Sequence, residues 1–199
     1  MRLHLAYRLT LAAVLAVATL PASAQVAPAA EMGGIPLAVG GGYSSYDVDW
    51  GHGRMGGGTV WLDWRLFSAT PSLRGLSVEA EARDISLGGS STQPNLRQDT
   101  IGAGILYAWP HFHNFRPYAK LVGGLGSEDF NVNLPHYHHD TRTMFAPGVG
   151  IDYRIAGHIW ARADYEYQLW QPLLSLTKTP NPQGFTGGIL YDFAAVHSR

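Results

Sequence analysis

The 199-residue chain contains no cysteine. This excludes disulfide bonds and a cysteine redox pair. Small exported proteins often use disulfides to reinforce a weak core. The stability of this chain must therefore come from another source.

Charge is also scarce. Charged residues make up 15% of the chain, and the formal net charge is −1. Such a balance gives no reason to expect a nucleic-acid partner. No phosphate-binding loop or nucleotide fingerprint is present, and we interpret the glycine-rich stretches GVGID and GGLGS as strand interiors, where glycine relieves crowding.

Long apolar runs are absent outside one segment near the N-terminus. Residues 9–20 are almost wholly apolar, follow Arg2 and Arg8, and precede Ala22-Ser23-Ala24, which has the form of a signal-peptidase site. We predict a signal peptide over residues 1–24 and a flexible periplasmic leader over 25–36. No later run approaches the ~20 residues of a membrane helix, so any membrane crossing must use strands.

Period-two alternation dominates the rest of the chain and predicts eight strands. Many of them exceed the usual ~5 to 6 residues and match the ~9 to 11 that a tilted strand needs to cross a bilayer. Compact connections alternate with longer polar ones, as in outer-membrane barrels. The predicted strands are 37–47, 56–67, 76–87, 98–109, 116–127, 142–155, 158–170 and 183–193.

The two faces of these strands differ in polarity. In residues 158–170, polar side chains such as Arg162 and Glu166 alternate with apolar ones. Aromatic residues gather near the strand ends of the apolar face, as the interface girdles of a membrane barrel do. The charged face is therefore expected to line a lumen. Two irregularities stand out: a phase change near Arg83-Asp84, interpreted as a bulge, and Pro147 inside a strand.

A resemblance to a known family becomes usable at the end of the chain. The signal peptide, eight alternating strands and the closing Tyr191-Asp192-Phe193 resemble the small outer-membrane β-barrel family, OmpA-like in its membrane part and often labelled porin-family. The resemblance implies an all-β, eight-stranded antiparallel up-and-down transmembrane β-barrel over residues 37–193, followed by a C-terminal tail, 194–199. It also implies a Gram-negative-type outer membrane and recognition of Phe193 by the barrel assembly machinery. We further expect a monomer in contact with outer-membrane lipid.

The inward charges are the main candidate site. Seven acids and five bases nearly balance, and buried charges must be paired. An eight-stranded barrel is just wide enough for side chains to fill it. We therefore expect an ion-pair plug, with a gated ion path and catalytic carboxylates as alternatives. The predicted network comprises Asp63, Arg65, Glu79, Glu81, Arg83, Lys120, Asp152, Arg154, Arg162, Asp164, Glu166 and Asp192.

Histidine and serine provide weaker candidates. Imidazole and carboxylate ligands suit zinc, nickel or copper, but the candidate motif lies in a polar loop. Solvated loop histidines are the simpler interpretation, so no metal, cofactor or catalytic residue is expected. The metal candidates are His136, His138, His139 and Asp140. His111 and His113 form a separate candidate pair for a metal. A lipid-modifying site would instead use Ser90, Ser91, His138, His139 and Asp140.

The sequence thus favours a non-enzymatic outer-membrane protein with a structural or surface-interaction role, exposing loops 88–97, 128–140 and 171–182. Alternatives are a small ion or solute channel, a lipid-modifying enzyme, and a soluble periplasmic barrel that binds a ligand.

Overall fold

The computed structural model describes residues 34–47, 53–66, 73, 75–87, 96–109, 113–130, 140–170 and 181–194. The predicted signal peptide lies outside these residues. Among the described residues, no helix has the length and apolar composition needed to cross a membrane. The strands are β1 (Gly34–Asp47), β2 (Arg54–Arg65), β3 (Leu76–Leu87), β4 (Leu96–Ala108), β5 (Phe115–Phe130), β6 (Asp140–Ala156), β7 (Ile159–Tyr167), β8 (Leu169–Trp170) and β9 (Gln183–Ala194).

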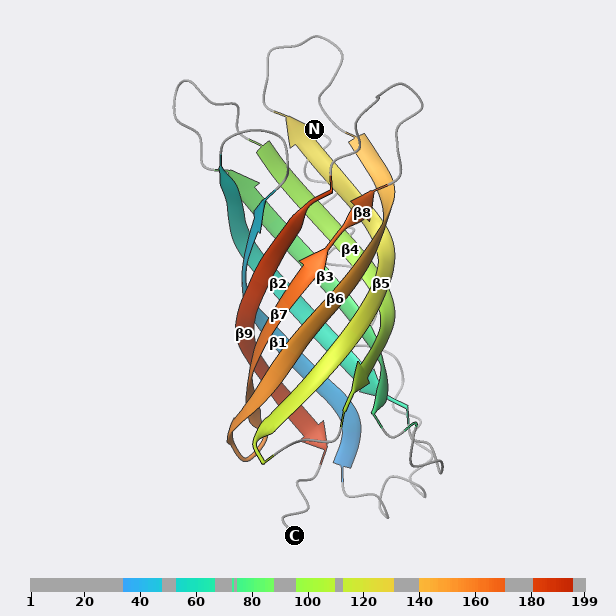
Figure 1. Ribbon diagram of the computed structural model, residues 1–199, viewed down its shortest axis with the longest axis vertical. Helices are drawn as coiled ribbons and strands as arrows, with labels where there is room; N and C mark the ends of the chain where they lie inside the picture. Colours follow the sequence, from blue (N-terminus) through green and yellow to red (C-terminus); the bar gives the residue numbers. More distant parts are fainter. Residues whose placement is uncertain are drawn as a thin grey trace, which may run out of the picture. The chain divides into compact units, whose positions relative to one another are not determined.

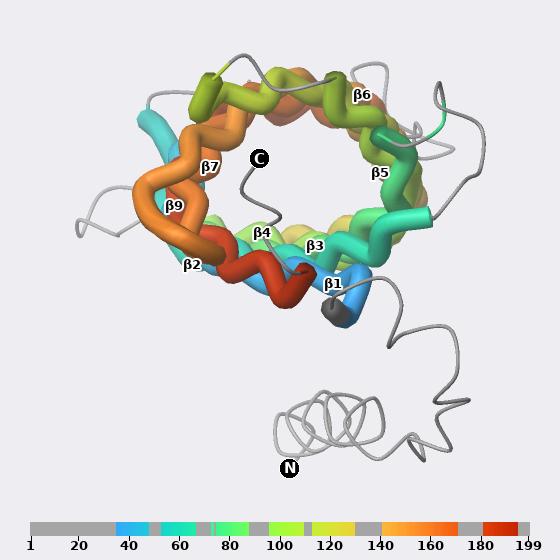
Figure 2. Tube along the Cα trace, turned by 90° about the horizontal axis from the view of Figure 1, so that it is seen from below, coloured from blue at the N-terminus to red at the C-terminus, as the bar shows by residue number. Residues whose placement is uncertain are grey.

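The strands close into an antiparallel barrel (Figures 1 and 2). Sequential neighbours pair, and β1 pairs with β9 to complete the ring. Segments β7 and β8 form one strand interrupted at Gln168, so the barrel has eight strands. The interruption lies opposite Ala146 of β6, beside Pro147, between the paired positions Gly148↔Glu166 and Phe145↔Leu169. Proline has no N–H to donate, which explains the gap in the ladder.

Strand boundaries differ from the predicted ones mainly at the ends. Strand β3 begins and ends where the sequence predicts, whereas β1 begins at Gly34, inside the predicted leader. Gly34 pairs with Ala194, the first residue of the predicted tail, across a register irregularity. Those parts of the leader and tail predictions are therefore wrong, because backbone pairing continues past the strongly patterned residues.

Apolar side chains cover the outer wall of the barrel. Large hydrophobic residues of every long strand are more than a third exposed, whereas alternate positions are buried inside. Outward aromatics gather toward both ends. Those on the side of the β6–β7 turn are Trp64, Trp109, Phe115, Tyr153, Tyr191 and Phe193; those toward the other end are Tyr43, Phe145, Tyr165 and Phe185.

The polarity of the two faces inverts toward the end of the barrel opposite the β6–β7 turn. On β3, Ile85 points inward and is buried, while Asp84 points outward and pairs with Arg97 of β4. The register of β3 runs without a shift against both neighbours. The predicted bulge at Arg83-Asp84 is therefore wrong. Alternation continues, but above the apolar band the inward residues of β1 to β4 become apolar and their outer wall polar, whereas β5 and β6 still place Glu128 and Arg142 inward.

Inward glycines allow neighbouring strands to approach closely. A Cβ on Gly104 of β4 would lie 1.9 Å from the Leu121 carbonyl oxygen and 2.6 Å from the Val122 Cα of β5. On the outer wall, a Cβ on Gly58 would meet nothing within 4 Å. The glycines that line the lumen thus make room for the long charged side chains of other strands.

A candidate functional site: the ion-paired lumen

Strands β3 and β7 face each other across the lumen. Three strands separate them in either direction around the ring, so they form opposite walls and run the same way along the barrel. The inward charged residues of β3 are Glu79, Glu81 and Arg83, in the charge order minus, minus, plus. Those of β7 are Arg162, Asp164 and Glu166, in the order plus, minus, minus. The two charge patterns are complementary at the levels of Glu79 and Arg162 and of Arg83 and Glu166, whereas Glu81 and Asp164 place two acids at the level between them, next to Lys120.

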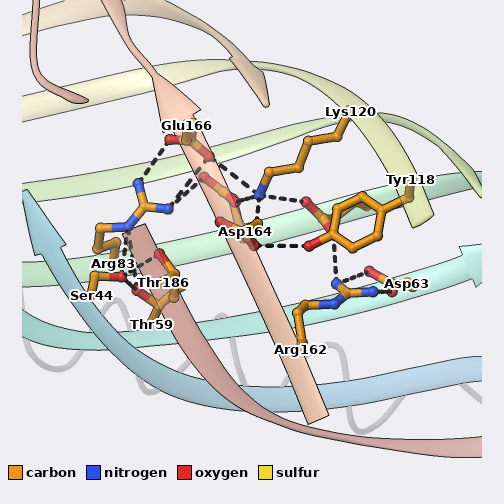
Figure 3. Close-up of polar contacts among 12 residues, drawn as sticks. Ser44, Thr59, Asp63, Arg83, Tyr118, Lys120, Arg162, Asp164, Glu166 and Thr186 are labelled. Carbon is orange, nitrogen blue, oxygen red and sulfur yellow. Dashed lines mark hydrogen bonds and ion pairs between the residues drawn. The ribbon is translucent and has the colours of Figure 1, made fainter. Parts of the chain in front are cut away.

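Arg162 is the centre of the cluster nearer the β6–β7 turn (Figure 3). Its Nη1 lies 2.9 Å from Glu79 Oε2, its Nη2 lies 2.7 Å from Asp63 Oδ2, and its Nε lies 2.9 Å from Asp152 Oδ1. The guanidinium also stacks over the Tyr118 ring at 4.9 Å. One planar group with five donors can serve three carboxylates in this way.

Arg83 is the centre of a second cluster, farther from that turn. Its Nη1 donates to Glu166 Oε1 at 3.0 Å, across the lumen. Its Nε contacts the hydroxyls of Ser44 and Thr59 at 3.2 and 3.3 Å. The Ser44 hydroxyl is also hydrogen-bonded to Thr59 and, at 2.8 Å, to Thr186. Arg83 is thereby held directly by β1, β2 and β7, and by β9 only through Ser44.

Lys120 of β5 joins the two arginine clusters. Its Nζ lies 2.8 Å from Glu81 Oε2, 3.1 Å from Glu79 Oε1 and 3.2 Å from Glu166 Oε2. A fourth carboxylate oxygen, Asp164 Oδ2, lies at 3.7 Å. An ammonium has only three donors, so four carboxylates compete for one cation at the centre of the barrel.

Uncharged side chains close the network toward the end opposite the β6–β7 turn. Gln168 donates to Glu166 at 3.0 Å and accepts from Gln98 and Trp170 at 3.0 Å each. Beside this layer lies a buried apolar cluster of Tyr46, Met55, Ile85 and Leu96. These side chains are 0 to 8% exposed, which separates the ion pairs from the loop-end mouth.

The other end of the lumen combines apolar and cationic side chains. Trp160 packs with Ala38 and Leu190, and the Arg116 guanidinium lies 4.5 Å above its ring. Arg116 also donates to Asp152 at 2.7 Å. The ion-pair network is therefore enclosed at both ends by packed side chains.

The structure places the twelve predicted lumen charges as follows. The Arg83, Lys120 and Arg162 clusters bring together Asp63, Glu79, Glu81, Asp152, Asp164 and Glu166. Arg65 pairs with Asp192 nearer the end of the barrel that carries the β6–β7 turn. Arg154 binds the Gly157 carbonyl at 3.1 Å and lies 5.9 Å from the Trp160 ring, outside the central network.

Sequence reasoning missed several residues of the lumen. Arg116 and Tyr118 share the alternation of Lys120, so the period-two pattern could have found them, but Pro117 obscures it. Alternation places Gln168 on the lumen face, but its part in the network and that of Gln98 were not predicted, because neither side chain is charged. Tyr118 donates to Asp164 at 3.0 Å.

The remaining predicted sites cannot be assembled from the described part of the chain. Ser90, Ser91, His111, His136, His138 and His139 lie outside the described residues, and Asp140 begins β6. His113 occupies a turn with φ of 59°. Over the described ranges, no group of three or more histidine and acidic side chains could hold a metal ion.

Solved structures share this barrel. Neisserial surface protein A (NspA) matches with a TM-score of 0.62 and 12% identity, covering 79% of this chain and 96% of its own. Ail, the attachment invasion locus protein of Yersinia pestis, matches with a TM-score of 0.53 and 16% identity, covering 81% and 99%. The outer membrane enzyme PagL matches with a TM-score of 0.50 and 11% identity, covering 78% and 99%. At these identities the likeness shows the fold alone.

No curated protein matches the chain by sequence. The family comparison is positive, because residues 10–193 match the family described as outer membrane protein beta-barrel domain. That match spans nearly all of the chain and agrees with the closed barrel and its apolar outer wall. The protein belongs to the outer-membrane β-barrel domain family, whose members reside in the outer membrane of Gram-negative bacteria.

Proposed function

We propose that this barrel is a non-enzymatic integral membrane protein with a sealed lumen and a structural or surface-interaction role. The observation that carries the proposal is the burial of Glu79, Lys120, Arg83 and Glu166, whose side chains have no exposed area, within a network that crosses the lumen. Ion pairs that span opposite walls brace the barrel and leave no room for a solute.

The energetics support a plug over a channel. Opening a path would require breaking several ion pairs at once, and removing one partner from a buried pair costs about 3 to 5 kcal/mol. The packed layers at both ends would also have to move. With the lumen closed, the segments that can meet an external partner are those between strands on the side opposite the β6–β7 turn.

The same arrangement argues against catalysis in the lumen. The six carboxylates around Arg83, Lys120 and Arg162 are 0 to 5% exposed, so a substrate could reach them only by displacing buried ion pairs. Because PagL, an outer membrane enzyme, has this fold, enzymatic activity still requires a direct test on lipid A. A lack of lipid A modification by the purified protein supports the proposal, whereas turnover lost on substitution of Ser90 or Ser91 by alanine would contradict it.

Conductance across a planar bilayer tests the seal. We expect the wild-type protein to conduct no more than a lipid control. Arg162→Ala and Lys120→Met each remove one of the three central cations and should introduce conductance if the plug is what closes the lumen. Steady conductance by the wild-type protein would favour the channel alternative.

Export and assembly form the remaining part of the proposal. We propose that residues 1–24 direct export, that the barrel assembly machinery recognises Phe193, and that the barrel is a monomer surrounded by lipid. Phe193 points outward, with its ring 4.8 Å from Tyr191. An epitope inserted between residues 131 and 139 should be reached by antibody on intact cells, and access only after the outer membrane is opened would reverse this topology.

A further inference from the structure

The mouth of the barrel at the β6–β7 turn holds more cations than acids; Figure 2 views the barrel from this end. Three inward arginines lie there, each partly exposed: Arg65 of β2, Arg116 of β5 and Arg154 of β6. Two acids face them. Asp192 pairs with Arg65, and Asp152 is shared between Arg116 and Arg162. One arginine of the mouth is therefore left without an acid.

Arg154 is that arginine. Its Nε donates to the Gly157 carbonyl oxygen at 3.1 Å, which holds the side chain at the turn. Within the described ranges of the chain it forms no ion pair. An arginine presents its donors in a fixed fork that matches the oxygens of a carboxylate or a phosphate. The two terminal nitrogens of Arg154 thus remain available to such a group.

Trp160 adds a donor beside Arg154. It is the cross-strand neighbour of Arg154 on β7, and its ring lies 4.5 Å from the Arg116 guanidinium and 5.9 Å from that of Arg154. Only 8% of Trp160 is exposed, and its Nε1 is buried without a hydrogen-bond partner in the part of the chain that the structure describes. An indole N–H can only donate, and a buried donor left unpaired is costly. An acceptor is therefore needed at this position.

Arg116 and the connections at this end extend the excess of donors. Arg116 binds Asp152 Oδ2 through Nε at 3.1 Å and Nη2 at 2.7 Å, whereas its Nη1 lies 3.9 Å from Asp192 Oδ2, beyond hydrogen-bond distance. The connections 66–75, 109–114 and 157–158 contain no aspartate or glutamate, but they include Arg74 and three histidines. Such a one-signed distribution of charge attracts anions.

We propose that this mouth binds a soluble oxyanion, a phosphate or a carboxylate, between Arg154, Arg116 and the N–H of Trp160. Hydrogen bonds from guanidinium groups to these anions are charge-assisted and strong. All three side chains belong to the inward face of their strands, so a free anion reaches them more directly than the headgroup of a lipid at the outer wall. The site lies outside the central ion pairs and does not depend on a sealed lumen.

Calorimetric titration of the full barrel in phosphatidylcholine nanodiscs, which leave both mouths in contact with buffer, tests the site. Inorganic phosphate and acetate are the probes, and chloride at equal ionic strength is the reference for charge screening. We expect saturable binding of at least one of the two oxyanions and only heat of dilution from chloride. The proposal is overturned by a lack of saturable binding at millimolar concentrations of both probes, or by an equal response to chloride.

Two variants locate the binding. Arg154→Gln removes a cation that has no acid partner, so the barrel should fold normally and bind the anion about tenfold or more weakly, as expected for the loss of a hydrogen bond to a charged group. Trp160→Phe keeps a ring beside Arg116 and removes the N–H, with an expected loss of about two- to tenfold. The heat-modifiable band on a gel verifies that each variant is folded.

Arg97→Gln is the matched control, because it removes an exposed arginine from the outer wall of β4 toward the opposite end of the barrel. It should bind the anion as the wild-type protein does. Wild-type affinity in both Arg154→Gln and Trp160→Phe, or an equal loss in Arg97→Gln, would place the binding elsewhere and overturn the proposal.

Nanodiscs that contain phosphatidylglycerol distinguish the source of the anion. At high ionic strength, where the surface potential of the lipid is screened, the affinity for phosphate should equal that in phosphatidylcholine. If phosphatidylglycerol abolishes phosphate binding, the ligand is a lipid headgroup and the assignment to a soluble anion is wrong. These titrations are independent of the conductance that tests the proposed function, so the two proposals can fail separately.

Discussion

Arg83 of β3 and Glu166 of β7 meet across the full width of the barrel, with 3.0 Å between Nη1 and Oε1. Their neighbours reverse the arrangement, since Arg162 of β7 reaches Glu79 of β3 at 2.9 Å. The two bridges therefore tie the same pair of opposite walls, with the cation on a different wall each time.

Replacing Arg162 with alanine should destabilise the barrel by about 3 to 5 kcal/mol, because three buried carboxylates lose their shared cation. Arg162→Lys should recover only part of the loss, since lysine lacks the planar fork. Urea unfolding in vesicles measures both. Arg97→Ala is the control: it removes an arginine whose side chain is 53% exposed and paired with Asp84, at an expected cost of about 0 to 1 kcal/mol. If Arg162→Ala and Arg97→Ala lower the free energy of unfolding equally, the lumen around Arg162 does not exclude water.

A double-mutant cycle isolates the cross-lumen bridge itself. Arg83→Met and Glu166→Gln should show a coupling energy of about 2 to 3 kcal/mol, as expected for residues in one buried network. The corresponding cycle on the outer wall, Arg97→Met with Asp84→Asn, should give less than about 1 kcal/mol. If the two couplings are the same, the lumen bridge gains nothing from burial.

Glycine substitutions test how closely the strands approach. Gly104→Ala would place a Cβ against the backbone of β5, and we expect a loss of about 1 to 3 kcal/mol as the strands are forced apart. Gly58→Ala adds the same methyl group to open space on the outer wall, so its unfolding free energy should be unchanged or slightly raised. If both variants lose similar unfolding free energy, crowding inside the barrel does not explain the loss at Gly104.

Charge insertion tests the lipid-facing wall. Ala163 of β7 is exposed between Ile151 and Gly187 on the neighbouring strands, and Ala163→Arg should cost about 2 to 4 kcal/mol near the membrane centre. Thr143→Arg places the same side chain on the outer wall of β6, nearer the boundary, where the cost is about 0 to 1 kcal/mol. Folding yield in liposomes, read as the heat-modifiable band on a gel, should fall only for Ala163→Arg.

The fold was largely predictable because one rule governs it. Period-two alternation separates lipid from lumen over the whole apolar band, which is why the bounds of β3 agree with the prediction. The rule weakens where the lipid ends. Strand β5 continues to Phe130, through Glu128 and Asp129, because backbone pairing does not require an apolar face. The polarity inversion at Asp84 and Ile85 has the same origin and resembles a bulge when only the sequence is considered.

The candidate site was predictable as a set of residues but not as a set of pairs. Alternation assigns Arg162 and Asp164 to the lumen, yet their partners depend on strand tilt and on the level each residue occupies, which sequence spacing does not give. Alternation places Gln168 in the lumen, but the layer that it forms with Gln98 was not predicted, because an uncharged amide does not indicate its hydrogen-bond partners. Its role follows only from the contacts that it makes with Glu166 and Trp170.

The complementary charge patterns of β3 and β7 also bear on how the barrel closes. Displacing β1 by two residues along β9 would keep every apolar side chain facing the lipid, because the side-chain period is two. Lipid contact alone cannot distinguish such a slipped barrel from the native one. The slip would, however, move β3 along the barrel relative to β7, and Arg83 would no longer meet Glu166. The charged interior thus selects one closure register among barrels of equal hydrophobic fit.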